Sequence, residues 1–251
     1  MIRAHLATFP PRQALVPNVV RAILPQVDRL FVVLNGYDEI PGYLADEEKV
    51  TAIIPDRDVK DAGKFWFRPD PDDIVFLIDD DLGYPPDYVS TTIAAAEAIG
   101  WEYGAFGHIG LIWRDEKMNG LAGWQLFRFH RENRKSKGMD LLCTNATVAR
   151  GAAIPPMEMI EPFAGYVDIG LATYLRDLGL EMWLLPHGES WLTNDLPPEL
   201  FASSLLATHA HSPPPMVKQA IHRLIADAPP NRGIPVHKFT RSGAGKPAHQ
   251  E

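Results

Sequence analysis

Short runs of apolar residues, separated by polar or glycine-containing segments, recur along the first third of the chain. The runs at residues 2–8, 30–34, 50–54 and 74–78 are rich in β-branched and aromatic side chains, which is typical of buried strands. Segments of helical or loop character separate these runs. The alternation predicts an α/β fold with a mostly parallel, Rossmann-like central sheet flanked by helices.

Apolar residues at helical spacing predict the helices. One helix is expected within residues 15–24, with Pro17 in its first turn because proline cannot donate a backbone hydrogen bond. Another is expected to begin near Asp87 and to end at Gly100. Its apolar face consists of Val89, Ile93, Ala96 and Ile99.

The second half of the chain is less regular. Residues 168–178 form an amphipathic helical pattern that stops at Gly179. Its apolar face consists of Ile169, Ala172, Leu175 and Leu178. Residues 181–185 predict a further strand, and residues 199–208 and 216–225 predict two last helices. Residues 101–138 lack strong periodicity and are expected to include a mobile loop over a binding site or to form an irregular surface segment.

Three adjacent carboxylates, Asp79, Asp80 and Asp81, directly follow the strand at 74–78. In open α/β sheets, ligands bind outside the carboxyl ends of the strands. Because neighbouring carboxylates repel one another, this position favours a cation or a basic partner. Mg²⁺ and Mn²⁺ prefer carboxylate oxygen and hold substrate phosphates as further ligands. The alternative that charge alone leaves open is a solvated acidic turn.

Composition and the motifs that the sequence lacks argue against several classes of protein. A formal net charge of −8 argues against nonspecific binding of nucleic acid. No G-x-G-x-x-G follows the first strand, which argues against a nicotinamide or flavin enzyme. The single cysteine, Cys143, excludes an internal disulfide, and no window reaches the ~18 apolar residues of a membrane span. We expect a cytoplasmic protein without a transmembrane segment, and peripheral membrane association stays open.

Six segments, taken together, resemble the GT-A glycosyltransferases and, within them, the inverting family 2 enzymes of the capsule and surface-polysaccharide type. They are ATFPPR at 7–12, VLNGY at 33–37, DAGKFWF at 61–67, FLIDDDLGYPPDYV at 76–89, CTNATVARG at 143–151 and VDIGLATYLRDLGLEMWLLP at 167–186. The resemblance implies a single GT-A domain at 1–228, with its nucleotide-binding part near 1–100 and its acceptor-binding part near 101–228. Residues 229–251 are expected to be a flexible or loosely docked tail.

The resemblance also implies roles for the acidic residues. Asp81 and Asp79 would bind Mn²⁺ or Mg²⁺, and Asp79 and Asp80 would contact the nucleotide-sugar. Asp168 would be the catalytic base, which is needed because a sugar hydroxyl is a poor nucleophile until its proton is removed. The alternative for Asp168 is a helix N-cap. The family often has a second acid just before this base, where Val167 stands here.

Other residues are assigned by the same resemblance. The predicted nucleotide-sugar site also includes Pro10, Arg12, Asn35, Asp61 and Lys64. His187 is the predicted third metal ligand, although it comes earlier than the family's usual spacing. His209 and His211 come later than this spacing, and an ordinary histidine is the alternative for each. His108 and Trp191 are predicted to line the acceptor site, since flat aromatic faces suit sugar rings, although Trp191 is equally compatible with the core.

The expected function is therefore metal-dependent, inverting transfer of a sugar from a nucleoside diphosphate donor, with UDP the commonest carrier, to a hydroxyl of a glycan or other acceptor. One alternative is a haloacid-dehalogenase-like phosphatase, but Gly83 stands where its motif requires Thr or Val. A sugar-1-phosphate nucleotidyltransferase would need a glycine-rich, basic first loop, which is absent. A nucleotide- or carbohydrate-binding module that has lost catalysis is the alternative without enzymatic activity.

Overall fold

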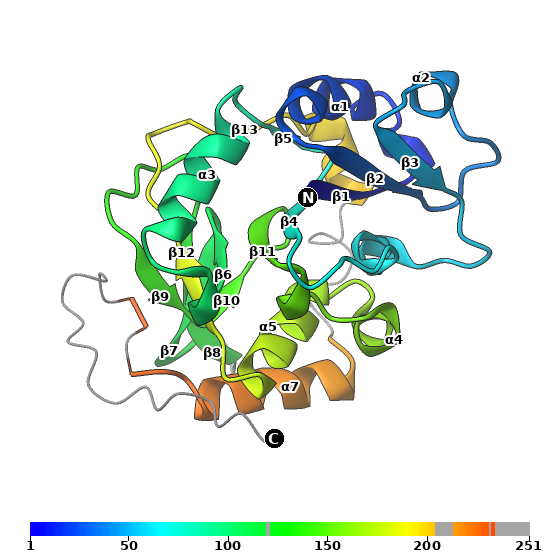
Figure 1. Ribbon diagram of the computed structural model, residues 1–251. Helices are drawn as coiled ribbons and strands as arrows, with labels where there is room; N and C mark the ends of the chain where they lie inside the picture. The colour runs from blue at the N-terminus through cyan, green and yellow to red at the C-terminus, as the bar shows by residue number, and fades with distance from the viewer. Residues whose placement is uncertain (119–120, 204–212, 231, 234–251) are drawn as a thin grey trace, which may run out of the picture.

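A mostly parallel sheet lies at the centre of the computed structural model, which describes residues 1–118, 121–203, 213–230 and 232–233 (Figure 1). Within these residues the sheet has eight strands. Their spatial order is β3 (Val50–Ile53), β2 (Arg29–Leu34), β1 (Ile2–Thr8), β4 (Ile74–Ile78), β11 (Ala146–Arg150), β6 (Gly104–Gly107), β12 (Glu181–Leu184) and β9 (Lys137–Met139). Only β11 and β9 run against the others. This architecture confirms the predicted α/β fold.

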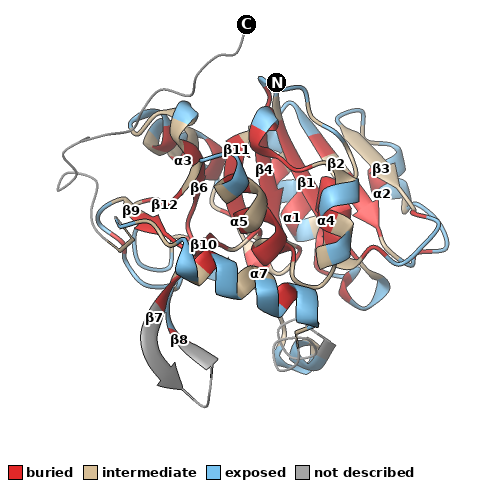
Figure 2. Ribbon diagram, turned by 90° about the horizontal axis from the view of Figure 1, so that it is seen from below, coloured by how far each residue is buried: buried red, intermediate tan, exposed pale blue. Residues whose placement is uncertain are grey.

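Helices cover both faces of the sheet (Figure 1). One face packs against α1 (Val16–Ile23), α2 (Gly42–Ala45) and α3 (Tyr88–Glu97). The other packs against α4 (Met157–Ile160), α5 (Val167–Asp177) and α7 (Pro215–Ala226). Figure 2 shows the buried strands between helices whose outer faces are exposed. Two apolar cores result, one on each side of the sheet.

Most of the predicted elements are confirmed. Strands β1 to β4 and β12 and helices α1, α3, α5 and α7 agree with the sequence pattern to within a few residues. Pro17 lies in the first turn of α1, and Gly179 follows α5 with a φ of 71°, a conformation that glycine adopts without strain. Leu178 departs from the prediction: it is 48% exposed, because α5 has already ended beside it.

Residues 101–138 differ most from the prediction. Instead of a loop, their described part contains β6 and a hairpin of β7 (Gly110–Met118) and β8 (Leu121–Phe127). The hairpin forms a small sheet with β10 (Leu141–Leu142). The prediction is therefore wrong for the described part of 104–127, whereas residues 128–136 do form an irregular and largely exposed segment.

Short 3₁₀-helices connect the main elements. They are η1 (Pro10–Arg12), η2 (Leu24–Gln26), η3 (Lys60–Phe65), η4 (Trp101–Tyr103), η5 (Gly151–Ala153), η6 (Glu161–Phe163) and η7 (Pro198–Ser203). η7 takes the place of the start of the helix predicted at 199–208, and residues 204–208 lie outside the described residues. So do His209, His211 and, at 231 and 234–251, most of the predicted tail. No described helix is both long and apolar enough to cross a membrane.

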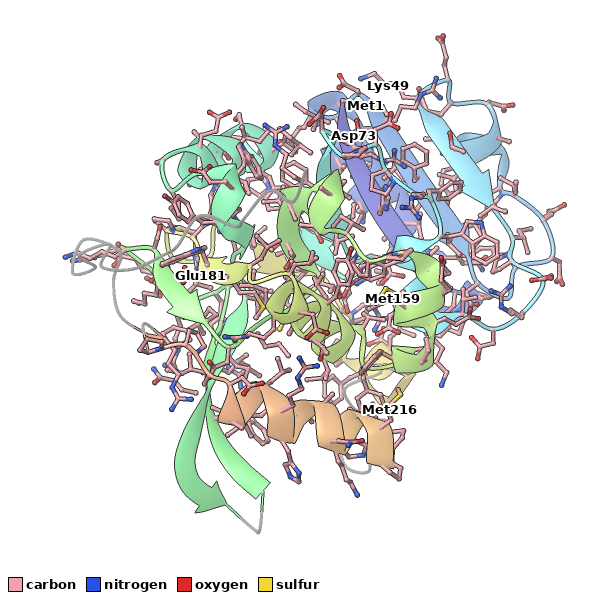
Figure 3. The ribbon with its side chains drawn as sticks, turned by 60° about the horizontal axis from the view of Figure 1, so that its bottom comes forward. Met1, Lys49, Asp73, Met159, Glu181 and Met216 are labelled. Carbon is pink, nitrogen blue, oxygen red and sulfur yellow. The ribbon has the colours of Figure 1, made fainter. Side chains whose placement is uncertain are left out.

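A buried polar network lies at the amino end of β1 and β4. The Arg3 guanidinium donates to Asp73 at 3.0 Å and to His5 Nε2 at 2.8 Å. Asp73 also pairs with the amino group of Met1 at 3.1 Å, and Figure 3 shows these two residues together. Because His5 Nε2 accepts a hydrogen bond, its Nδ1 donates the bond to Lys64 O, at 2.7 Å. Burial, aided by the charge of Arg3, lowers the pKa of His5 to about 3 and keeps the ring neutral.

Candidate functional site

Strand directions bring the predicted acidic motifs together. β1 and β4 are parallel neighbours, so the segments after Thr8 and Ile78 leave the sheet at one edge. β11 is antiparallel to β4, with Ala146 opposite Ile78. The residues that precede β11 therefore lie at the same edge, where ligands of α/β sheets bind. We call this edge the carboxyl edge.

A later part of the chain braces the loop that carries Asp79, Asp80 and Asp81, which we call the acidic loop. β5 (Leu82–Gly83) pairs with β13 (Thr193–Asn194), and the Asp195 amide donates to Asp81 O at 2.8 Å. A Cβ on Gly83 would lie 2.1 Å from Thr193 Oγ1, which explains the glycine. The loop that follows β12 thus fixes the backbone of the acids.

Asp80 is the most deeply buried of the three acids, at 2% exposure. It accepts hydrogen bonds from Thr8 Oγ1 and Arg12 Nη1, both at 2.7 Å. The same Arg12 nitrogen lies 2.8 Å from Asp81 Oδ2. Arg12, which extends from η1, therefore links the first loop to the acidic loop. The Arg12 guanidinium is therefore paired with the carboxylates of Asp80 and Asp81.

η3 supplies a second cation to the site. A Cβ on Gly63 would lie 2.8 Å from Val33 Cγ1, so glycine allows η3 to lie directly on the sheet. The neighbouring Lys64 side chain is 3% exposed and forms an ion pair with Asp79. Its Nζ also donates to Thr144 O at 3.3 Å and to Thr144 Oγ1 at 3.2 Å.

Asp61 and Asp168 lie beyond Lys64. Asp61 accepts a hydrogen bond from the Gly165 amide at 2.5 Å, just before α5. Asp168 is the second residue of α5, and Tyr166 occupies the N-cap position. Asp168 Oδ1 accepts from Thr144 N at 2.8 Å and from Thr144 Oγ1 at 2.7 Å. The carboxylate thus contacts another segment of the chain, and the alternative that Asp168 is an N-cap is wrong.

Negative charge is in excess at this edge. Among the described residues, the acids Asp61, Asp79, Asp80, Asp81 and Asp168 surround two cations, Arg12 and Lys64. Burial, followed by the charge of Asp79, raises the pKa of Asp81 to about 6. Burial also raises the pKa of Asp61 to about 6, and it raises the pKa values of Asp80 and Asp168. The site therefore favours an added positive charge.

Asp79 and Asp81 are the acids best suited to a divalent cation. Their side chains are 30% and 17% exposed, and burial, followed by the charge of Asp79, raises the pKa of Asp81. Hard carboxylate oxygens match the preference of Mg²⁺ or Mn²⁺, so these two residues fit such an ion. No group of three described Asp, Glu, His or Cys side chains forms a metal site. The predicted set of Asp79, Asp81 and His187 is therefore not assembled.

Pro10 and Asn35 lie in the loops that follow β1 and β2, respectively. Pro10 is exposed at the start of η1. Asn35 follows β2, donates to Asp58 Oδ1 at 2.9 Å and accepts from the Val59 amide at 2.9 Å. Asn35 therefore holds the segment before η3 against the end of β2. Its predicted contact with a nucleotide stays a prediction.

The predicted acceptor residues belong to an aromatic cluster between α3 and β12. His108 is 0% exposed, its Nε2 lies 2.9 Å from Thr92 Oγ1, and its ring packs 4.9 Å from Trp191. A direct acceptor contact by His108 is thus wrong for this structure. His187 packs against His108 at 5.5 Å. Trp191 is half-buried and donates to Asp87 at 3.1 Å, which agrees with the core alternative.

Two polar residues of the site were missed by the sequence analysis. Thr8 supports Asp80, and Thr144 supports Asp168. Thr144 lies within the segment CTNATVARG that carries part of the resemblance. Nothing in its sequence setting distinguishes it from Thr147, because the antiparallel course of β11 is what brings Thr144 to the carboxyl edge.

Comparison with known proteins finds solved structures of similar fold at low sequence identity. 4-Diphosphocytidyl-2C-methyl-D-erythritol synthase aligns over 83% of this chain and 98% of its own, with a TM-score of 0.50 and 12% identity. Glucosyl-3-phosphoglycerate synthase from Mycobacterium tuberculosis, in complex with Mn²⁺, UDP-glucose and phosphoglyceric acid, aligns over 90% of this chain and 79% of its own, with a TM-score of 0.46 and 16% identity. No family model and no curated protein matches the chain. The finding concerns the fold alone, a Rossmann-like α/β sheet.

Proposed function

We propose that the protein is a metal-dependent inverting glycosyltransferase that uses a nucleoside diphosphate sugar, with UDP as the carrier. One observation carries the proposal: five carboxyl groups meet two buried cations at the carboxyl edge of an α/β sheet. An anionic diphosphate alone would add to this excess of negative charge. A divalent cation held by Asp79 and Asp81 would offset it and the charge that develops on the departing diphosphate.

The chain's own residues have separate roles in this proposal. Asp168 accepts the proton of the acceptor hydroxyl as its oxygen bonds to the anomeric carbon, while the bond from that carbon to the phosphate oxygen breaks. The electron pair leaves with the nucleoside diphosphate. Attack from the face opposite the leaving group inverts the configuration. Burial raises the pKa of Asp168, and so makes its carboxylate a stronger base than a solvated aspartate.

The nucleotide is proposed to lie over the first loop. Pro10, Arg12 and Asn35 would border the base and ribose, with Asp61, Lys64, Asp79 and Asp80 nearer the phosphates and sugar. Arg12 and Lys64 already pair with Asp80, Asp81 and Asp79. We therefore expect their main effect to be on the shape and charge of the acidic loop.

The test measures binding and chemistry separately. UDP should raise the melting temperature only when Mn²⁺ or Mg²⁺ is present, and this effect should vanish in Asp81→Ala. Asp168→Asn should keep the stabilisation but lose about 10²- to 10⁴-fold in release of UDP from nucleotide-sugars. Asp72→Asn, at an exposed site before β4, is the control.

Three results would contradict this proposal. UDP binding that is undiminished by a chelator would exclude a metal bridge. Release of orthophosphate from phosphate esters would favour the phosphatase alternative. Metal-dependent binding without release of UDP from any of a panel of nucleotide-sugars, with and without glycan acceptors, would favour a binding module.

A further inference from the structure

The bonds around Thr144 go beyond the roles proposed above. Asp168 Oδ1 accepts two hydrogen bonds from this one residue, from its amide and from its hydroxyl. Burial, followed by the negative charge of Asp168, raises the pKa of the neighbouring Cys143 thiol, and a thiol is in any case a weak donor. The rotation of the carboxylate is therefore set mainly by Thr144.

The hydroxyl proton of Thr144 has a defined direction. Lys64 Nζ can only donate, and it lies 3.2 Å from Thr144 Oγ1. The hydroxyl oxygen therefore accepts from Lys64, and its single proton is left for Asp168 Oδ1, at 2.7 Å. The donors run in one direction, from Lys64 through Thr144 to Asp168.

The other bonds of Lys64 connect this series of hydrogen bonds to the acidic loop. Its ammonium group has three protons, and its three partners are Asp79, Thr144 O and Thr144 Oγ1. Its backbone carbonyl accepts from His5 Nδ1. Lys64 is thus held at both ends, which suits an internal counter-ion better than a side chain that moves to a substrate phosphate.

From these contacts we infer that Thr144 is a positioning residue that orients the Asp168 carboxylate toward the acceptor hydroxyl, and that Lys64 orients Thr144. This inference rests on the proposed function, because it assigns a task to the proposed base. A merely structural role would be to hold α5 against the segment before β11. The two roles differ in what a variant changes: orientation of the base affects turnover, whereas structural support affects stability and nucleotide binding together.

The experiment compares Thr144→Val with Thr144→Ser. Valine keeps the shape and the amide but removes the hydroxyl, whereas serine keeps the hydroxyl. The matched control is Thr147→Val, since Thr147 is also buried and its hydroxyl donates to Cys143 O rather than to a carboxylate. The assay is Mn²⁺-dependent release of UDP from UDP-glucose, together with the affinity for UDP and Mn²⁺ by calorimetry.

We expect Thr144→Val to lower kcat by about 10- to 100-fold, with the KM for UDP-glucose and the affinity for UDP changed less than about twofold. Thr144→Ser should recover kcat to within about threefold, and Thr147→Val should leave it unchanged. In an Asp168→Asn background, Thr144→Val should have no further effect on kcat. Thr144→Ala serves the same comparison should the valine variant not fold.

The outcomes separate this inference from the proposed function. Two results would overturn the inference and leave the proposed transferase intact. One is a kcat for UDP release that is the same in Thr144→Val as in wild type. The other is a loss of kcat on Thr144→Val that is equally large in the Asp168→Asn background. Equal losses of UDP affinity and kcat would also overturn it in favour of a structural role. A wild-type protein that binds UDP and Mn²⁺ but releases no UDP from UDP-glucose or from any other nucleotide-sugar of the panel would overturn both.

Discussion

Buried charges are balanced by partners of opposite sign at the amino end of β1 and β4, whereas acids are in excess at the carboxyl edge. At the amino end, Asp73 meets Arg3 and the amino group of Met1, and His5 is neutral. At the carboxyl edge, acids outnumber cations, and the pKa of Asp81 is raised to about 6. Both ends contain an arginine that pairs with aspartate. A buried Arg–Asp pair therefore indicates nothing about function by itself, whereas an excess of buried acids over cations is the feature on which the proposed site rests.

The largest effect on stability is expected at the amino end. Asp73→Asn would leave the Arg3 guanidinium, whose side chain is 5% exposed, without its charged partner. Breaking a buried ion pair in this way costs about 3–5 kcal/mol in the free energy of unfolding. Urea denaturation monitored by circular dichroism measures the change. Asp72→Asn, at the exposed neighbouring position, should leave the free energy of unfolding within about 0.5 kcal/mol of wild type. An equally small change for Asp73→Asn would show that the buried charges at the amino end do not depend on this pair.

A smaller effect of opposite sign is expected at the carboxyl edge. Asp81→Asn removes one of the surplus charges, and Arg12 keeps its bond to Asp80. In the presence of a chelator, the free energy of unfolding should be unchanged or higher by about 1 kcal/mol. The same urea titration tests this. A loss of several kcal/mol would show that Asp81 is a structural partner like Asp73.

The pH dependence should distinguish the two acids further. Burial alone would raise the pKa of Asp73, but hydrogen bonds from Arg3 and the amino terminus outweigh it and lower the pKa below 3.8. Its stabilisation is therefore present above pH 3.8 and lost as the pH falls. Asp81 behaves oppositely: its folded pKa of about 6 lies above 3.8, so the folded state holds an extra proton and stability falls as pH rises between these values.

Unfolding midpoints at pH 4, 5 and 6 in chelator measure this fall. Between pH 4 and 6, wild type should lose about 1–2 kcal/mol more than Asp81→Asn. The pKa of Asp61 is also raised to about 6, and it contributes equally to both proteins. Parallel curves for the two proteins would mean that Asp81 is ionised in the folded protein throughout this range.

The regular elements could be predicted from sequence because their signal is local. β4 and α5 were found from runs and periodicities within their own residues. β6 and β11 were missed because they depend on distant partners. β6 lies between β11 and β12, and a Cβ on Gly104 would lie 1.9 Å from Glu181 O of β12. The hairpin of β7 and β8 likewise depends on cross-strand pairing.

The candidate site divides in the same way. Asp79, Asp81 and Lys64 were singled out because they lie in motifs whose residues are close in sequence. The support of Asp168 by Thr144 depends on the antiparallel entry of β11, which no local pattern reveals. The burial of His108 depends on α3 packing over it, with Thr92 as its partner. Sequence reasoning found the charged groups but not the neutral ones that hold them.

The brace between β5 and β13 has a consequence for how the protein is made. The backbone of Asp81 is tied to Asp195, which leaves the ribosome more than a hundred residues later. A nascent chain with only the first four strands emerged would hold the acids by their side-chain contacts with Thr8, Arg12 and Lys64 but would lack the backbone tie to Asp195. The backbone around the proposed cation site would thus be completed only near the end of translation, after the intervening chain has emerged.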